Sequence, residues 1–167
     1  RFEETLEPAG IPANAERTRV REGGVYLVTG GLGGMGFSLA ERLARTHRAK
    51  LVLVGRSALA PEEQWDTWLA THGANDRTSR RIAAIREIRR HGGDVWTAAA
   101  DVADVERMRE VLCAAKERFG PLNGVLHAAG SLEEGLIQTK SPESVERVFS
   151  TKLHGTLVLS QLIANEP

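Results

Sequence analysis

The chain has 167 residues, 41% of them hydrophobic and 26% charged, values typical of one globular domain and unlike those of disordered or fibrous proteins. Its 22 basic and 22 acidic side chains balance, so the overall charge favours neither nucleic acid nor an anionic membrane as a partner. The single cysteine, Cys113, excludes an internal disulfide, and no apolar run approaches the roughly 20 residues of a membrane span or resembles a secretory signal. These features predict a protein of the reducing cytoplasm.

Residues 1–23 differ from the rest of the chain. They are polar, carry Pro8 and Pro12, and follow neither the period of a strand nor that of a helix. We interpret them as a linker or entering arm, and residues 24–167 as one domain.

The stretch from Val25 to Gly36 predicts a nucleotide-binding turn. An apolar, partly β-branched run ends in a cluster of glycines, and a helical pattern from about Gly34 to His47 follows at once. Glycines let the backbone turn sharply and leave no side chain between its amide groups and a phosphate, while a helix N-terminus offers free N–H donors. A glycine-rich turn without a ligand is the alternative. The candidate contacts to a dinucleotide pyrophosphate are Thr29, Gly30, Gly31, Leu32, Gly33, Gly34, Met35 and Gly36.

The elements alternate between strands and helices, which predicts a Rossmann-like α/β fold. Expected strands cover Val25–Thr29, Leu51–Gly55, Val95–Ala100 and Gly124–Ala128. Expected helices cover residues 34–47, 62–69, 79–91, 105–119 after the cap Asp104, and 142–164 after the cap Ser141 with Pro142 at its first position. Such alternation requires parallel pairing and right-handed crossovers. We therefore predict about four parallel strands in the order 3-2-1-4, helices on both faces, and a nucleotide at the carboxyl ends of the strands.

The end of the second predicted strand indicates which dinucleotide binds. An acidic residue at this place would hold the ribose 2′-hydroxyl of NAD, but the place is occupied by Arg56, followed by Ser57. A guanidinium can bind the 2′-phosphate of NADP through two parallel hydrogen bonds, so Arg56 and Ser57 favour NADPH. The alternative is an arginine in a solvated loop.

The ends of the third and fourth predicted strands supply the other candidate contacts. Asp101, followed by Val102, could accept a hydrogen bond from the adenine amino group or could simply close a turn. We interpret His127 as structural and predict no metal site, because no second ligand stands at metal-binding spacing from it. The small residues that would let the ribose and nicotinamide of the cofactor approach the backbone are Ala128, Ala129 and Gly130.

Lys152 lies within the last predicted helix and falls on its apolar stripe, which predicts that it faces inward. Burying a lysine is costly unless it has a function. A lysine whose charged end reaches the surface beside Gly155 explains the pattern equally well. The stripe consists of Val145, Val148, Phe149, Thr156, Leu159 and Ile163.

Two features of the long connection between the second and third predicted strands invite other interpretations. Trp65, Trp68 and Leu69 form an apolar edge, which favours core or neighbouring-domain packing over base stacking because no basic groove accompanies it. The arginine-rich segment from Arg80 to Arg90 could meet an acidic protein partner, but a solvated helix face is the favoured interpretation.

Taken together, the motifs resemble the ketoreductase domains of modular type I polyketide synthases, a branch of the short-chain dehydrogenase/reductase superfamily. The resemblance covers nearly the whole chain from Gly24 onward. It rests on the stretches Tyr26–Gly36, Leu51–Ser57, Ala100–Val102, Leu126–Gly130 and Thr151–Thr156.

The resemblance implies a cofactor, a reaction and partners. The cofactor would be NADPH, and the reaction would reduce a β-ketoacyl chain to a β-hydroxyacyl chain on the phosphopantetheine arm of an acyl carrier protein, among neighbouring synthase domains. Lys152 matches the lysine of the catalytic set, which lowers the pKa of a tyrosine that protonates the developing alkoxide while a serine hydrogen-bonds the carbonyl oxygen. The alternatives are a fatty-acid-type or other short-chain reductase, and a non-catalytic nucleotide-binding or scaffold module.

The chain departs from this family in two ways. Family members carry the serine and the tyrosine on a fifth strand beyond the position of Pro167, whereas the one tyrosine of this chain is Tyr26, inside the first strand. We therefore expect the front, cofactor-binding part of a ketoreductase, inactive in isolation and prone to self-association through an unpaired fourth strand. The second departure is Leu132-Glu133-Glu134, which stands where one stereochemical class carries Leu-Asp-Asp, or is only a solvated acidic loop.

Overall fold

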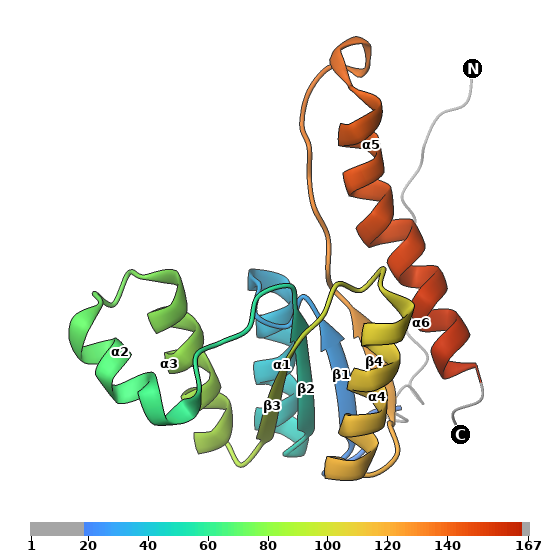
Figure 1. Ribbon diagram of the computed structural model, residues 1–167. Coiled ribbons are helices and arrows are strands. Elements are labelled where there is room, and N and C mark those ends of the chain that lie inside the picture. Colours follow the sequence, from blue (N-terminus) through green and yellow to red (C-terminus); the bar gives the residue numbers. More distant parts are fainter. Residues whose placement is uncertain (1–18, 165–167) are drawn as a thin grey trace, which may run out of the picture.

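The computed structural model describes residues 19–164, so residues 1–18 of the arm predicted at residues 1–23 lie outside the described part of the chain. At its centre is a sheet of four parallel strands, β1 (Val25–Thr29), β2 (Lys50–Gly55), β3 (Asp94–Ala99) and β4 (Gly124–His127). The strands lie in the order β3-β2-β1-β4, with Tyr26 of β1 opposite Leu51 of β2 and Gly124 of β4. This arrangement confirms the predicted fold (Figure 1).

Helices cover both faces of the sheet. One face carries α1 and α3, and the other carries α4 and α6 (Figure 1). The helices are α1 (Gly34–His47), α2 (Trp65–Thr71), α3 (Arg77–Arg90), α4 (Val105–Phe119), α5 (Pro142–Phe149) and α6 (Gly155–Ile163). Short 3-10 turns at Glu62–Gln64 and Ile137–Thr139 precede α2 and α5. Within residues 19–164, none of the helices has the length and apolar character needed to cross a membrane.

The alternation of side chains along the strands divides the core into two layers. Leu27, Val52 and Val54 pack on the side of α4 and α6, whereas Val28 and Leu51 pack on the side of α1 and α3. All five side chains are at most 1% exposed. Parallel strands buried on both faces consist of continuous apolar runs, which explains why β1 and β2 could be located from the sequence.

Polar side chains cap three of the helices. Asp76, Asp104 and Ser141 each accept a hydrogen bond from the backbone N–H three residues further on, at the starts of α3, α4 and α5. The predicted caps Asp104 and Ser141 are confirmed, and Pro142 occupies the first turn of α5 as expected. The cap at Asp76 starts α3 two residues earlier than the sequence pattern indicates.

The C-terminal helical segment differs from the single helix that the sequence predicts. A π-helical turn at Ser150–His154 separates α5 from α6, and α5 extends away from the sheet (Figure 1). The predicted inward stripe is wrong for Val145 (38%), Phe149 (50%), Lys152 and Thr156, which are exposed, but Leu159 of the same stripe is buried. A wider turn rotates the faces of α6 relative to those of α5, so helical spacing counted across it does not define one surface. The side chains buried in this segment are Ser144, Gly155, Val158 and Leu159.

The long connection after β2 packs onto the fold through its tryptophans. Trp65 is 4% exposed, and its indole N–H donates to the Ala60 carbonyl at 2.8 Å. The Trp68 indole N–H donates to the carboxylate of Asp76 at 3.1 Å, and its ring stacks on His72. The core interpretation of Trp65 is therefore confirmed, and α2 is tied to the N-terminus of α3.

Candidate nucleotide-binding site

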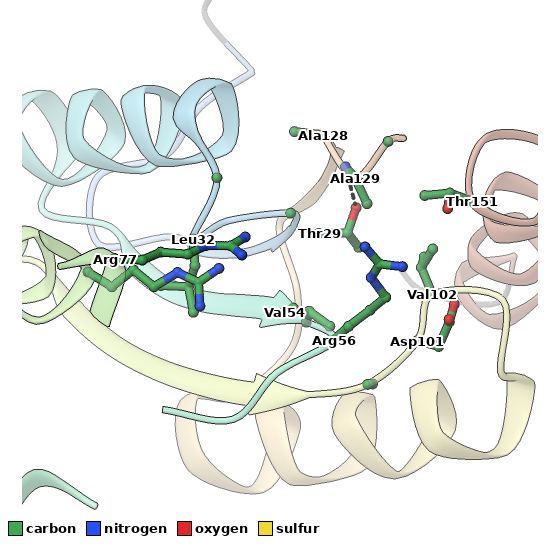
Figure 2. Close-up of a pocket in the computed structure, with 16 residues that line it drawn as sticks. Thr29, Leu32, Val54, Arg56, Arg77, Asp101, Val102, Ala128, Ala129 and Thr151 are labelled. Carbon is green, nitrogen blue, oxygen red and sulfur yellow. Dashed lines mark hydrogen bonds between the residues drawn. The ribbon is translucent and has the colours of Figure 1, made fainter. Parts of the chain in front are cut away.

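A cavity of about 190 Å³ opens at the carboxyl ends of all four strands (Figure 2). This is the edge of the sheet at which the sequence predicts a nucleotide. The predicted contact residues that line the cavity are Thr29, Gly30, Leu32, Gly33, Arg56, Asp101, Val102, Ala128, Ala129 and Gly130.

The glycine-rich turn needs a glycine at two positions. Gly30 has a φ of +67°, and a Cβ there would lie 2.7 Å from the carbonyl oxygen of Ala128. A Cβ at Gly36 would collide with the carbonyl group of Gly30. The Gly30 N–H donates to the Val54 carbonyl at 2.8 Å, and the Gly33 N–H donates to the Gly30 carbonyl at 2.8 Å. A side chain at Gly30 or Gly36 would therefore displace the turn that forms one wall of the cavity.

The α1 helix begins beside this cavity without a side-chain cap. Gly33 occupies the N-cap position and has no side chain to accept a hydrogen bond, and the first turn contains no acidic residue. The first N–H groups of a helix lack intrahelical partners, and the helix dipole adds a partial positive charge at that end. The start of α1 is therefore suited to an anion such as a phosphate.

A hydrogen-bonded chain connects β1, β4 and the π turn. The Thr29 hydroxyl oxygen lies 2.6 Å from His127 Nδ1, and His127 Nε2 lies 3.2 Å from the Thr151 carbonyl oxygen. Because the carbonyl can only accept, Nε2 carries the proton and the Thr29 hydroxyl donates to Nδ1. The same hydroxyl oxygen accepts the Ala129 N–H at 3.3 Å. His127 thus holds the π turn against the end of β4, which is a structural arrangement of the kind expected from the sequence.

The ends of β2 and β3 present charged side chains to the cavity. Arg56 is exposed, and Figure 2 shows its side chain running from the end of β2 toward Thr29. The Asp101 carboxylate accepts the Ala103 N–H at 3.0 Å, so it closes a turn and also lines the cavity. Val102 is 4% exposed and contacts α6 at Gly155, where a Cβ would lie 2.6 Å from Val102 Cγ1.

Some predicted cofactor contacts lie outside the cavity. Gly31 and Gly36 are buried behind the turn, where their backbones pack against the strands and against Gly30. Met35 is 75% exposed, and Ser57 is also exposed. Gly34 lines a neighbouring hollow between α1 and α3.

Lys152 lies in the π turn close to the end of β4. Its side chain is exposed, and a Cβ placed on Gly130 would lie 3.6 Å from Lys152 Cε. Tyr26 lies elsewhere, 3% exposed within β1, with its hydroxyl oxygen accepting the Arg21 N–H at 2.7 Å. The one tyrosine of the chain is therefore part of the core and does not line the cavity.

The structure adds two arginines of α3 to the cavity wall. The solvated face expected for this helix is wrong for Arg81, whose Nε atom is buried without a hydrogen-bond partner. Burial, and secondarily the charge of Arg77, lowers the pKa of Arg81. The signal in the sequence is the i, i+4 spacing of Arg77 and Arg81 at the start of a helix with no acidic residue in its first turn. The other lining residues that the sequence did not indicate are Val54, Gly55, Ala100 and Thr151.

The acidic loop after β4 is held by α5. Glu133 Oε1 lies 2.5 Å from Arg147 Nε, and this hydrogen bond lowers the pKa of the Glu133 carboxyl. Lys140 donates to the Glu133 carbonyl oxygen. The interpretation of this loop as a solvated acidic loop therefore holds for Leu132 and Glu134, which are exposed, but not for Glu133, which is paired with Arg147. Among residues 19–164, no group of three or more His, Cys, Asp or Glu side chains is placed to hold a metal ion.

Comparison with protein families identifies the chain through residues 24–167, which match the model of the KR domain. The chain belongs to the KR domain family. Polyketide synthase PksM of Bacillus subtilis is 35% identical to this KR domain over 151 residues, which are 90% of this chain and 3% of that protein. The 6-methylsalicylic acid synthase of Aspergillus terreus is 35% identical over 135 residues, which are 80% of this chain and 7% of that protein. The KR domain described here thus spans less than a tenth of either relative.

Solved structures similar to this KR domain include two ketoreductases from assembly lines. An N-terminal ketoreductase from the macrolactin assembly line superposes with a TM-score of 0.73 at 32% identity, covering 89% of this chain and 27% of that chain. A ketoreductase domain from the bacillaene assembly line gives 0.73 at 30% identity, covering 99% and 34%. The 3-oxoacyl-[acyl-carrier protein] reductase of Brucella melitensis, solved in complex with NAD, gives 0.66 at 26% identity, covering 87% and 49%.

The residues of this KR domain fit a nicotinamide dinucleotide. The turn at Gly30 leaves no room for a Cβ, so Gly30 and Gly33 present backbone and no side chain to that wall of the cavity. The uncapped start of α1 is suited to a pyrophosphate, and the unpartnered Nε of Arg81 is suited to a further anionic group. These three features are what a phosphorylated dinucleotide requires at the carboxyl end of a parallel sheet.

Proposed function

We propose that this chain forms the NADPH-binding part of a ketoreductase that reduces a β-ketoacyl group, carried by an acyl carrier protein within a polyketide synthase, to a β-hydroxyacyl group. The observation that carries the proposal is the cavity in which a glycine-rich turn and the start of α1 adjoin Arg56, where an acidic residue would select NAD. Membership of the KR domain family supports the class of reaction, and the name of the Brucella neighbour supports an acyl carrier protein as partner.

Each wall of the cavity has a role in this proposal. The amides of the turn and the start of α1 bind the pyrophosphate, and Arg56 with Ser57 binds the 2′-phosphate. The Asp101 carboxylate accepts a hydrogen bond from the adenine amino group. The small residues Ala128, Ala129 and Gly130 leave room for the nicotinamide ribose beside β4. NADPH supplies the hydride when bound.

Lys152 is the proposed catalytic residue. Its Cε atom would lie 3.6 Å from a Cβ placed on Gly130, and its ammonium group would stabilise the ionised form of a nearby tyrosine and so lower the pKa of that tyrosine. Tyr26 cannot be that tyrosine, because it is buried within β1 and bonded to Arg21. We therefore expect the isolated chain to bind NADPH without reducing a ketone.

The proposed setting is a cytoplasmic synthase with neighbouring domains. In residues 19–164, β4 is hydrogen-bonded to β1 on one side, and its other edge pairs with no strand. An apolar strand edge of this kind favours pairing with another chain. We expect the isolated chain to self-associate, and light scattering that finds only monomer would contradict this.

The test is a calorimetric titration of the chain with NADPH and with NADH, repeated on Arg56→Ala and on the control Arg90→Ala. A charge-assisted hydrogen bond that is lost lowers affinity by about tenfold or more, so NADPH should bind more tightly and lose its preference in the Arg56 variant. The control removes the same charge from an arginine that pairs with Glu87 outside the cavity. Equal binding of the two nucleotides by folded protein would contradict NADPH as the cofactor.

A further inference from the structure

Helix α3 carries two groups of arginines in different surroundings. Those of its C-terminal half form ion pairs: Arg86 lies 2.6 Å from Asp66, Arg89 lies 2.6 Å from Glu62, and Arg90 pairs with Glu87. Those of its N-terminal half form no ion pair with any residue between positions 19 and 164. The unpaired arginines are Arg77, Arg80 and Arg81.

Two of the unpaired arginines face the cavity together. Arg77 and Arg81 are four residues apart on α3, and both line the cavity beside Leu32 and Gly33 of the glycine-rich turn. Figure 2 shows the Arg77 side chain running from α3 toward Leu32. The Nε atom of Arg81 is fully buried and has no hydrogen-bond acceptor. A guanidinium that is partly withdrawn from water without a counter-ion is unfavourable, and an anion bound to the part of Arg81 that lines the cavity would offset that cost.

The charges around this pair are unfavourable in the absence of an anion. Arg77 lies close enough to lower the pKa of Arg81, which is the effect of one positive charge on another. The carboxylate of Asp76 caps the start of α3, but it accepts its hydrogen bonds from Ser79 and Trp68 and forms no ion pair with Arg77 or Arg81. An anion with two or more charges between Arg77 and Arg81 would offset their mutual repulsion.

The position of the pair indicates which anion it meets. A pyrophosphate at the start of α1 places the adenosine ribose over the end of β2, between the turn at Leu32 and Arg56. Arg56 lines the cavity from β2, and the α3 pair lines it from the side of Leu32. A 2′-phosphate monoester carries a charge of about −1.5 to −2 at neutral pH and three acceptor oxygens, so it can bind more than one guanidinium.

We propose that Arg81, with Arg77, forms the second half of the 2′-phosphate site opposite Arg56, and that Arg81 contributes, together with Arg56, to the preference for NADPH over NADH. This inference rests on the proposed function, because it assigns a contact of the same cofactor. Arg81 is a specificity-determining residue, and its role does not require hydride transfer.

The test measures the affinities of the chain for NADPH, NADH, adenosine 2′,5′-bisphosphate and adenosine 5′-monophosphate by calorimetry. The variants are Arg81→Gln, Arg81→Lys and the control Arg90→Gln, which removes the same charge from the paired half of α3. In Arg81→Gln the preference for the 2′-phosphorylated member of each pair should fall about ten- to hundredfold, with NADH affinity unchanged. Arg81→Lys should lose less of this preference, because lysine keeps the positive charge but lacks the planar guanidinium that forms two parallel hydrogen bonds. Arg90→Gln should keep the full preference.

The outcomes separate this inference from the proposed function. If Arg81→Gln weakens NADPH and NADH equally, Arg81 meets the pyrophosphate and the 2′-phosphate assignment is overturned. If NADPH is preferred and Arg81→Gln leaves that preference intact, the inference also fails while the proposed function stands. If the unaltered chain, folded by circular dichroism, binds none of the four nucleotides, both proposals fail. A melting temperature of Arg81→Gln at or above that of the unaltered chain establishes that lost binding does not come from lost folding.

Discussion

Both halves of α3 carry arginines, but the arginines of the two halves lie in different surroundings and make different contacts. In the C-terminal half, arginines join the helix to the connection that precedes it: Arg89 binds both carboxylate oxygens of Glu62 and lies over the ring of Trp65. In the N-terminal half, Arg77 and Arg81 face the cavity without a counter-ion among residues 19–164. Paired arginines hold the fold together, whereas unpaired ones beside a cavity are available to a ligand. We therefore expect the presence or absence of a carboxylate partner to separate structural from ligand-binding arginines within this helix.

The largest effect should follow from giving the N-terminal half a carboxylate of its own. Leu32 lies beside Arg77 and Arg81 at the cavity, so Leu32→Asp places a negative charge where the phosphate would bind. Like charges brought together cost several kcal/mol, and we expect NADPH affinity to fall about a hundredfold in calorimetry. Leu32→Asn, of similar size and uncharged, should retain most of the affinity. An Asp variant that binds NADPH as tightly as the Asn variant would contradict the anion site.

The next largest effect should follow from removing an ion pair in the C-terminal half of α3. Arg89→Ala removes the Glu62 pair and the contact with Trp65, and should lower the free energy of unfolding by about 1–2 kcal/mol in urea denaturation. The hydrogen bond from Arg89 lowers the pKa of Glu62 below its ordinary value of 4.5. The pair therefore stabilises the fold above that pH and loses its contribution as the pH falls further.

The pH dependence of stability and the cofactor preference of Arg89→Ala together test this prediction. The stability gap between the unaltered chain and Arg89→Ala should narrow below about pH 4.5. The ratio of NADPH to NADH affinity at neutral pH should not change, because Arg89 does not line the cavity. A variant that loses cofactor preference without losing stability would contradict the division of α3 into two halves.

A smaller effect concerns the cap that holds the N-terminal half in place. Asp76 accepts hydrogen bonds from the Ser79 N–H and from Trp68, and these bonds lower the pKa of its carboxyl to about 2. Asp76→Ala should lower the melting temperature and weaken the NADPH preference, whereas Asp76→Asn, which keeps an acceptor, should retain both. Because the folded-state pKa is depressed, the contribution of Asp76 is present above pH 3.8 and disappears as the pH falls toward 2. An Asn variant as impaired as the Ala variant would contradict the capping role.

The smallest expected effect is a gain in the stability of the chain without nucleotide, where the preceding variants lose stability or affinity. Arg81→Gln relieves the burial of an unpaired guanidinium and its repulsion by Arg77, so the chain without nucleotide should be unchanged or more stable by a few tenths of a kcal/mol. Thermal melts without and with NADPH measure both consequences: a small rise in the first and a reduced ligand-induced rise in the second. A clear loss of stability without nucleotide would mean that Arg81 is a structural arginine like Arg89.

Much of the structure around the cavity at the carboxyl ends of the strands could be predicted from the sequence. The strand β1 was located to the residue, and the turn at Gly30 was recognisable because a positive φ beside the backbone of β4 requires glycine. The caps Asp104 and Ser141 were predictable because a cap bonds to a backbone group only three residues away. The orientation of Lys152 was not, because the π turn at Ser150–His154 shifts the helical period at that residue.

Local patterns by themselves determined the strand order, the glycine-rich turn and the edge of the sheet at which the cavity opens, because these depend on periodicity and on chain connectivity. The tertiary structure alone decided which arginines of α3 are paired and which face the cavity. Arg89 meets Glu62 across 27 residues of chain, and Arg81 meets the turn at Leu32 across the whole β2 crossover. Such partners are set by how α3 packs on the sheet beside α1. The i, i+4 spacing of Arg77 and Arg81 indicates only that the two side chains share a face of the helix, and not what that face meets.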